Sequence, residues 1–143
     1  MPTPSFDRLS LSLHYILYHS KLAPTAPVSC VSDIIKTARG FNAIHGLSGV
    51  LMFDGQHFMQ YLEGPKEDVW KLLVSIAQDP RHVDFKLQHQ GECAGERLFM
   101  GWSMGYALVN DSDLLGDLGH LGSLMGQDAM NKLHALVPML DIA

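Results

Sequence analysis

Basic residues are scarce in this sequence: 10 Lys and Arg stand against 15 Asp and Glu, giving a formal net charge of −5 with His neutral. Proteins that bind nucleic acid regardless of its sequence need a basic surface to neutralise phosphates. The sequence has no such electrostatic footprint. We therefore expect no direct binding to nucleic acid.

Cysteine is also scarce, and long apolar runs are missing. Cys30 and Cys93 are the two cysteines; they lie far apart and show no metal-ligand spacing. We therefore expect both cysteines to be reduced thiols of a cytoplasmic protein, and we expect no metal site. Residues 1–10 lack the apolar core of a signal peptide, and no apolar run approaches membrane-spanning length. We expect no association with a membrane.

The length of 143 residues allows one hydrophobic core and is too short for two ordinary domains. Apolar residues make up 47% of the chain and charged residues 17%, which is typical of a globular protein rather than a disordered one. The proline-bearing residues 1–9 are interpreted as a leader. We predict one folded domain over 10–108 and a helical extension over 109–143.

Hydrophobic periodicity predicts five strands and two helices in the first 108 residues. The strands are expected over 10–19, 47–53 and 57–63, around Phe85 and Leu87, and over 98–108; the helices are expected over 31–42 and from Pro65 to near Asp79. The resulting order is βαββαββ. Its first six elements match the ferredoxin-like split βαβ motif, an α+β fold with two helices on one face of an antiparallel sheet.

The last 35 residues differ in character from the rest, because glycines interrupt their apolar pattern. Two apolar stripes remain: Leu114, Leu118, Leu121 and Met125, then Leu133, Leu136, Val137 and Leu140. This pattern favours two short helices over a long one. Helices on one face of a sheet leave the other face bare, so we predict that residues 111–140 cover that open face.

Gln60 is an amide in the middle of a predicted buried strand. An unsatisfied buried polar group costs about 1–3 kcal/mol, so its donor and its acceptor both need partners. Tyr18 is expected beside it, since the first and third strands are neighbours in this topology. Asn42 lies on the apolar stripe of the first predicted helix. Together the three suggest a planar heterocycle between the helices and the sheet, with Asp79 and Arg81 closing the slot.

Each of these residues also has an ordinary structural explanation, except for Gln60, which is hardest to explain without a ligand. A tyrosine on a strand is commonly part of the core. Asn42 has the residue type and the position of a helix C-cap. Asp79 and Arg81 flank a proline and form an ordinary turn with a solvated charge pair. Trp102 and Met104 alternate as core residues do. From these patterns alone the ligand site stays open.

Six segments together resemble the BLUF domains, blue-light sensors that use flavin. They occur in the same order and spacing over residues 10–106: Tyr18-His19-Ser20, the run from Ala38 to Asn42, Gly46-Leu47-Ser48-Gly49-Val50-Leu51, Phe58-Met59-Gln60-Tyr61-Leu62-Glu63-Gly64, Asp79-Pro80-Arg81-His82 and Trp102-Ser103-Met104. The Gln-containing strand ending in Glu-Gly, with the distant Trp-x-Met, is a specific combination.

The resemblance implies a role for each matching residue. Tyr18 is the redox-active phenol, Gln60 bridges Tyr18 to the N5 and O4 edge of the flavin, and Asn42 holds the flavin carbonyl and N3 edge. Further expected flavin contacts are Ile34, Asp79, Arg81 and His82, with Met104 and Trp102 near Gln60 on the last strand. The implied cofactor is FAD, with FMN as an alternative. Two positions depart from the family: Phe41 replaces an Asn or His, and Ser75 replaces an arginine found in some members.

The resemblance also implies a function: a short, stand-alone blue-light sensor without enzymatic activity. We expect it to be a homo-oligomer and to signal to a downstream partner protein by contact. A light-inert flavin-binding module is one alternative. Another is a small acylphosphatase-like enzyme, but the loop over 21–29 offers Lys21 without an arginine or a glycine-rich run.

Overall fold

The computed structural model describes residues 13–93, 97, 99, 103–108 and 124–136. Four of its elements come from the first half of the chain: β1 (Leu13–Leu22), α2 (Cys30–His45), β2 (Ser48–Phe53) and β3 (His57–Pro65). The other four are α3 (Lys66–Ala77), β4 (His82–Glu92), β5 (Gly105–Leu108) and α5 (Gly126–Leu136). The predicted leader, residues 109–123 and 137–143 of the tail and Trp102 lie outside the described residues.

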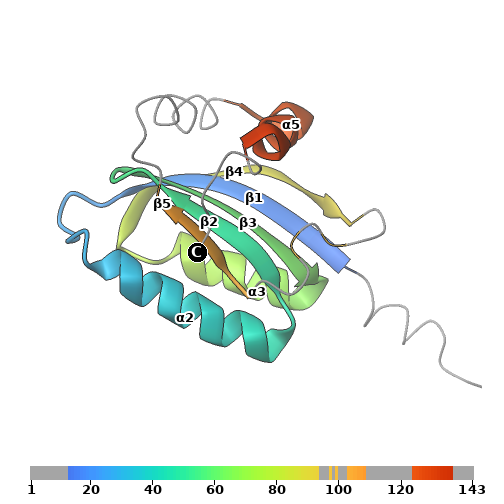
Figure 1. Cartoon of the computed structure of the whole chain (residues 1–143), viewed down its shortest axis with the longest axis horizontal. Coiled ribbons are helices and arrows are strands. Elements are labelled where there is room, and N and C mark those ends of the chain that lie inside the picture. The colour runs from blue at the N-terminus through green and yellow to red at the C-terminus, as the bar shows by residue number, and fades with distance from the viewer. Residues whose placement is uncertain (1–12, 94–96, 98, 100–102, 109–123, 137–143) are drawn as a thin grey trace, which may run out of the picture.

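The five strands form one sheet in the order β4-β1-β3-β2-β5. Helices α2 and α3 cover one of its faces, and α5 lies against the other (Figure 1). The predicted α+β, ferredoxin-like fold is confirmed. The sheet is mixed rather than purely antiparallel, because β5 runs parallel to β2 while the other three pairings are antiparallel.

The strand predicted over 98–108 begins later than expected: among the described residues of that range, the strand is Gly105–Leu108. Ser103 and Met104 precede it and do not join the ladder. The side chain of Asn42 donates to the carbonyl oxygen of Ser103 at 2.5 Å, and Arg39 Nε donates to that of Met104 at 3.0 Å. The carbonyl groups of Ser103 and Met104 thus accept hydrogen bonds from side chains of α2 and do not pair with β2.

Helix α2 extends beyond its predicted end at Asn42, to His45. Gly46 ends it with φ +71°, the left-handed region that glycine adopts without a Cβ penalty, and its N–H donates to the carbonyl oxygen of Asn42. Gly46, and not Asn42, is therefore the C-cap. The side chain of Asn42 is left free of that task and is fully buried.

Two hydrophobic cores sandwich the sheet, one on each face. The first lies under α2 and α3 and includes Ile16, Val31, Leu51, Phe58, Leu62, Val69 and Met104. The second lies under α5 and includes Leu17, Met52, Met59, Tyr61, Ala129, Met130, Leu133 and Leu136. The prediction that the tail covers the open face is confirmed for residues 126–136.

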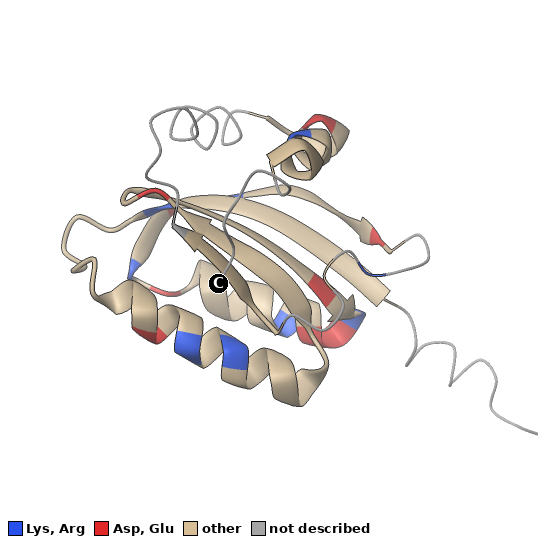
Figure 2. Cartoon of the chain, in the orientation of Figure 1, with Lys and Arg blue, Asp and Glu red and all other residues tan. Residues whose placement is uncertain are grey.

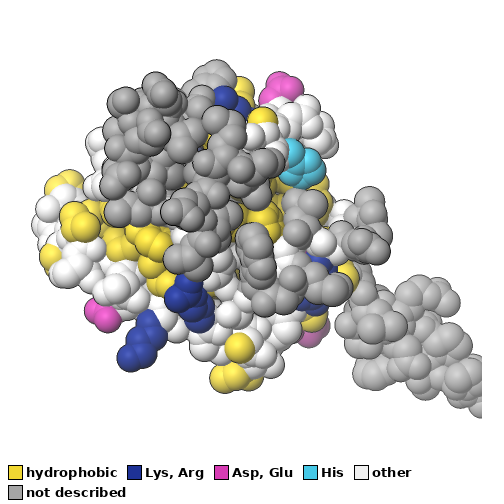
Figure 3. Space-filling model, in the orientation of Figure 1, with side chains coloured by type: hydrophobic (Ala, Val, Ile, Leu, Met, Phe, Trp, Pro, Cys, Tyr) yellow, Lys and Arg dark blue, Asp and Glu magenta, His cyan; other side chains and the backbone are white. Residues whose placement is uncertain are grey.

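Basic and acidic residues are both spread over several elements of the described ribbon (Figure 2). The face drawn in Figure 3 likewise carries separate basic and acidic side chains among hydrophobic ones. This distribution agrees with the absence of a basic footprint from the sequence. Within the described ranges, no helix is long and apolar enough to cross a membrane.

Candidate functional site

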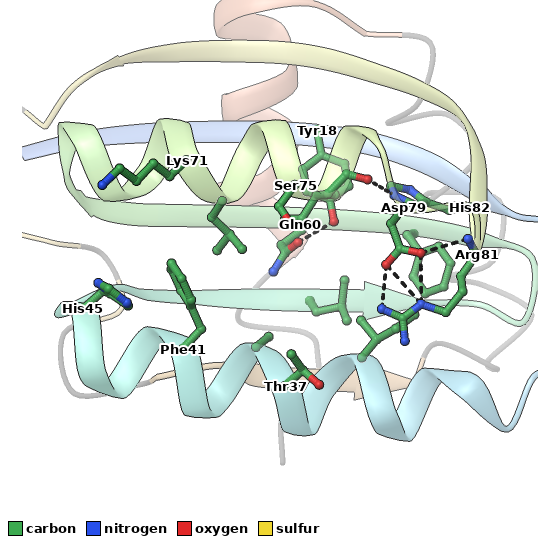
Figure 4. A pocket seen from close by; sticks show the side chains of 16 residues that line it. Tyr18, Thr37, Phe41, His45, Gln60, Lys71, Ser75, Asp79, Arg81 and His82 are labelled. Atoms are coloured by element: carbon green, nitrogen blue, oxygen red, sulfur yellow. Dashed lines mark hydrogen bonds and ion pairs between the residues drawn. The ribbon is translucent and has the colours of Figure 1, made fainter.

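A cavity of about 250 Å³ lies between helices α2 and α3, above the sheet (Figure 4). Apolar side chains from both helices form much of its wall, including Ile34, Ala38, Phe41, Leu72 and Ile76. Tyr18 and Gln60 enter it from the sheet. A mostly apolar slot with a few convergent polar groups is the usual form of a small-molecule site.

Tyr18 and Gln60 meet directly at the cavity. They are paired across the β1–β3 ladder, so their side chains leave the same face of the sheet. The Tyr18 hydroxyl donates a hydrogen bond to Oε1 of Gln60. Each residue is only 4% exposed. The predicted proximity of the two residues is confirmed.

Burial raises the pKa of the Tyr18 phenol well above its usual value of 10, and the nearby Asp79 carboxylate raises it further. Both causes disfavour the phenolate form. Tyr18 is therefore a neutral phenol at physiological pH. Its proton is shared with the oxygen of Gln60 rather than with water.

Met104 is the neighbour of Gln60 on its other side. Gln60 Nε2 donates to the thioether Sδ of Met104 at 3.6 Å, and Met104 is 3% exposed. The structure thus places Met104, one of the two candidates, beside Gln60, and the other candidate, Trp102, lies outside the described residues. A thioether is a weak acceptor, so the amide group of Gln60 keeps donor capacity for a better partner.

Asn42 is brought close to this group but not into the cavity wall. It faces the sheet beside β5, and its Nδ2 is bound to the carbonyl oxygen of Ser103. Its Oδ1 is buried without a hydrogen-bond partner among the described groups. An orphaned buried acceptor is costly, so this amide has unused capacity beside the slot.

Asp79, Arg81 and His82 line one end of the cavity, as expected. The guanidinium of Arg81 donates to Asp79 through Nε at 3.0 Å and through Nη2 at 2.5 Å. These hydrogen bonds lower the pKa of Asp79, so it stays ionised. His82 donates through Nε2 to the carbonyl oxygen of Ile76, which fixes its ring beside Tyr18. The turn therefore lines the cavity, while the Asp79–Arg81 pair stays partly exposed to solvent.

The opposite end of the cavity is lined by Phe41 and His45 from α2 and by Lys71 from α3, and Ser75 of α3 lies nearer its middle, beside Gln60 (Figure 4). The ring of His45 stacks on Phe41 at a centroid distance of 4.1 Å, and its Nδ1 lies 3.3 Å from Asp68. His45 and Lys71 were missed by the sequence interpretation. Their spacing could have revealed them, because each lies one helical turn, four residues, from a position that departs from the family.

These residues fit a planar heterocycle. Two helices and a sheet bound a slot with polar groups at its base and at both ends, and the amides of Gln60 and Asn42 both have capacity to spare. Over the part of the chain that the structure describes, no group of His, Cys, Asp and Glu is arranged to hold a metal ion.

Comparison with known proteins agrees with this geometry. A family model described as BLUF, sensors of blue-light using FAD, matches residues 13–105. The blue light- and temperature-regulated antirepressor BluF of Escherichia coli is 37% identical over 69 residues, which are 48% of this chain and 17% of that protein. The chain thus spans a small part of this curated relative.

Solved structures extend the comparison to the whole fold. The dark-state structure of the BLUF protein BlrB matches with a TM-score of 0.76 and 29% identity, over 90% of this chain and 96% of that one. Klebsiella pneumoniae BlrP1 with FMN and cyclic diGMP matches with a TM-score of 0.65 and 28% identity, over 76% and 30% of the two chains.

Proposed function

This chain belongs to the BLUF family of blue-light sensors that use flavin, and we propose that Tyr18 and Gln60 form its light-driven switch beside a flavin held between α2 and α3. The observation that carries this proposal is the buried hydrogen bond from the Tyr18 hydroxyl to Gln60 Oε1, at the base of a cavity of the right form.

A bound flavin supplies two things, absorption of blue light and an acceptor for one electron. Tyr18 is suited to donate that electron, because its phenol is neutral and already hydrogen-bonded to a proton acceptor. If the electron left Tyr18, its proton would pass along this bond to Oε1 of Gln60, and Nε2 would release a proton toward the electron acceptor, so that the side chain ends as its neutral imidic tautomer. Charge on the phenol ring is thereby avoided in an environment that penalises it.

Gln60 then changes its hydrogen bonds, by rotation or by tautomerisation, so that donor and acceptor exchange places. Support comes from its neighbours: one side faces the Tyr18 hydroxyl and the other faces the weak acceptor Sδ of Met104. Reversing the amide would turn a different atom toward each of them and would change the hydrogen bond that Gln60 offers to a bound ring. The changed bond shifts the absorption of the ring and changes the contact with the segment that holds Met104.

The cofactor we propose for this site is FAD, with FMN as the alternative. Ile34 would pack against the ring. The otherwise unpartnered Oδ1 of Asn42 would accept a hydrogen bond from N3–H, and the second N–H of its Nδ2 would donate to the adjacent ring carbonyl. Asp79, Arg81 and His82 hold the end nearest Tyr18. Trp102 remains a predicted neighbour of the switch.

Output from the switch is contact with a partner protein rather than catalysis. The Escherichia coli relative is named as an antirepressor, which favours a protein partner. Leu17 and Met59 adjoin Tyr18 and Gln60 in β1 and β3 and pack under α5 on the other face. We propose that the domain over 10–108 signals through the extension over 109–143, in a homo-oligomer.

The test is an absorption spectrum of the purified chain before and after blue light. A yellow protein with a reversible red shift of the flavin band is the expected result. A yellow protein that does not respond would leave the light-inert flavin module. A colourless protein that takes up no added flavin would remove flavin from the account.

A further inference from the structure

Two positions that depart from the family line the cavity. Phe41 from α2 lies at the end opposite Asp79, and Ser75 from α3 lies beside Gln60, between that end and Asp79 (Figure 4). The family has Asn or His at the first position and, in some members, arginine at the second. With Phe and Ser there, this chain has lost the long polar side chains that would reach a ligand at that end.

Each loss is matched by a longer polar side chain one helical turn away. Lys71 lies four residues before Ser75 on α3, and His45 lies four residues after Phe41 on α2. Residues four apart share a face of a helix, so both remain on the cavity side. The structure indeed places Lys71 and His45 in the cavity wall, on opposite helices at the same end (Figure 4).

Of the two replacements, Lys71 is the available donor. His45 is held by the Phe41 ring at 4.1 Å and by Asp68 at 3.3 Å. Lys71 makes no ion pair with any described residue, and Asp68, three residues before it on the same helix, lies 3.3 Å from His45. An ammonium on a four-carbon stem can turn its three donors toward a ligand.

The order of atoms around the flavin ring decides which group meets Lys71. Along the pyrimidine edge, N5 is followed by the C4 carbonyl, N3 and the C2 carbonyl. The proposed function places N5 and O4 at Gln60 and N3 toward Asn42, near the C-terminal end of α2. The C2 carbonyl then falls at the end lined by Phe41, His45 and Lys71, farthest from Asp79.

We propose that Lys71 binds the C2 carbonyl of the flavin and replaces the donors lost at positions 41 and 75. This inference rests on the proposed function, since it assumes a flavin in the cavity. Lys71 is thereby a cofactor-binding residue of the ring itself. Lys71 donates to the ring carbonyl and does not pair with a phosphate group of the cofactor.

The experiment compares Lys71→Met with the control Lys66→Met, a lysine on the same helix that does not line the cavity. The probes are FAD and riboflavin, which lacks phosphate, both carrying ¹³C at C2. We expect Lys71→Met to weaken binding of both probes about tenfold, the lower range for a charged hydrogen bond at an exposed site. The C2 carbonyl stretch should move to higher frequency, and Lys66→Met should change neither quantity.

A second variant moves the cation by one helical turn. Adding Ser75→Arg to Lys71→Met should restore affinity for both probes and return the C2 carbonyl band toward its original frequency. Loss of affinity for FAD but not for riboflavin would assign Lys71 to a phosphate and overturn the inference. An unmoved C2 carbonyl band in Lys71→Met, with flavin still bound and photoactive, would also overturn the inference. That result would leave the proposed function intact. Failure of the unmodified chain to bind either probe would overturn both.

Discussion

The two faces of the sheet are built from alternate residues of the same strands, yet they differ: among the described residues, one face opens into a cavity and the other packs against α5. Beneath α5, Leu17 and Met59 pack directly against Leu133 and its neighbours. Beneath α2 and α3, Tyr18 and Gln60 open into a cavity of about 250 Å³. Because side chains alternate along a strand, each residue of the proposed switch is followed or preceded directly by a residue of the packed core.

The comparison indicates that the two faces have different roles. The hollow face tolerates polar groups because they bind each other and a ligand, whereas the packed face can respond to a shift in β1 or β3 without containing the ligand. Close-packed interiors transmit such displacements, since they have little empty volume in which to absorb them. Changes on the hollow face should therefore abolish the response, and changes on the packed face should alter stability.

The largest expected effect is that of Tyr18→Phe. The ring keeps its packing against Phe85, so flavin should still bind. Without the hydroxyl there is no proton to pass to Gln60, and the reversible red shift should disappear. Light-minus-dark absorption spectra measure this directly. A complete photocycle in the variant would remove Tyr18 from the switch.

Gln60→Leu should have nearly the same effect on the light response. Leucine is close to glutamine in volume and suits the apolar wall, so flavin binding should persist. No amide is left to exchange its hydrogen bonds with Tyr18 and Met104. The red shift should be absent in the same spectra. A normal shift would show that the Gln60 amide is not needed.

Leu133→Ala tests the packed face. Leu133 is fully buried beneath α5, and truncation of such a residue costs about 2–5 kcal/mol in the free energy of unfolding. Met125→Ala, at a position 52% exposed, is the control and should change stability little. Denaturant unfolding gives both values. The folded Leu133→Ala chain should keep its flavin. Loss of flavin from the folded variant would contradict the view that the packed face affects stability alone.

His19 gives the account a pH dependence. Burial, and then the neighbouring His57, lowers the pKa of His19 from 6.5 to about 4, despite the opposing Asp54 carboxylate. Between these two pH values the unfolded chain binds a proton that the folded chain does not, so stability is complete above pH 6.5 and falls as the pH drops toward 4. We expect a loss of about 2 kcal/mol between pH 7 and pH 5.

The matched variant is His19→Leu, which removes the titrating ring. Urea unfolding at the two pH values should show a smaller loss for this variant than for the unmodified chain. Equal losses in both chains would assign the pH dependence to other groups.

The smallest expected effect is a change in the protection of α5. If the switch displaces β1 or β3, backbone amides of residues 126–136 should exchange faster with solvent under blue light than in the dark. Gln60→Leu is the control and should show no difference. Identical exchange in the unmodified chain would mean that α5 only covers the sheet and that the signal leaves elsewhere.

The sequence predicted the pairing of Tyr18 with Gln60 because two simple regularities determine it. Alternation places both side chains on known faces of their strands, and the split βαβ topology makes those strands neighbours. The covering of the second face was predictable for the same reason: the apolar spacing of Leu133 and Leu136 requires a bare surface to bury them.

The placement of Asn42 could not be predicted from helical periodicity. The buried stripe of α2 is wide enough to face both the cavity and the sheet beside β5, and Asn42 lies on the β5 side. Its partner is a backbone carbonyl of Ser103, 61 residues away, and no sequence pattern marks that contact. The late start of β5 has the same origin, since α2 binds the carbonyl groups before it.

The most direct test of the central claim is an infrared difference spectrum, blue light minus dark, with the glutamine side-chain amides labelled with ¹⁵N. The account predicts that labelled amide bands appear in the difference and that all of them vanish in Gln60→Leu. A reversible red shift of the flavin band without any change in a glutamine amide would contradict it.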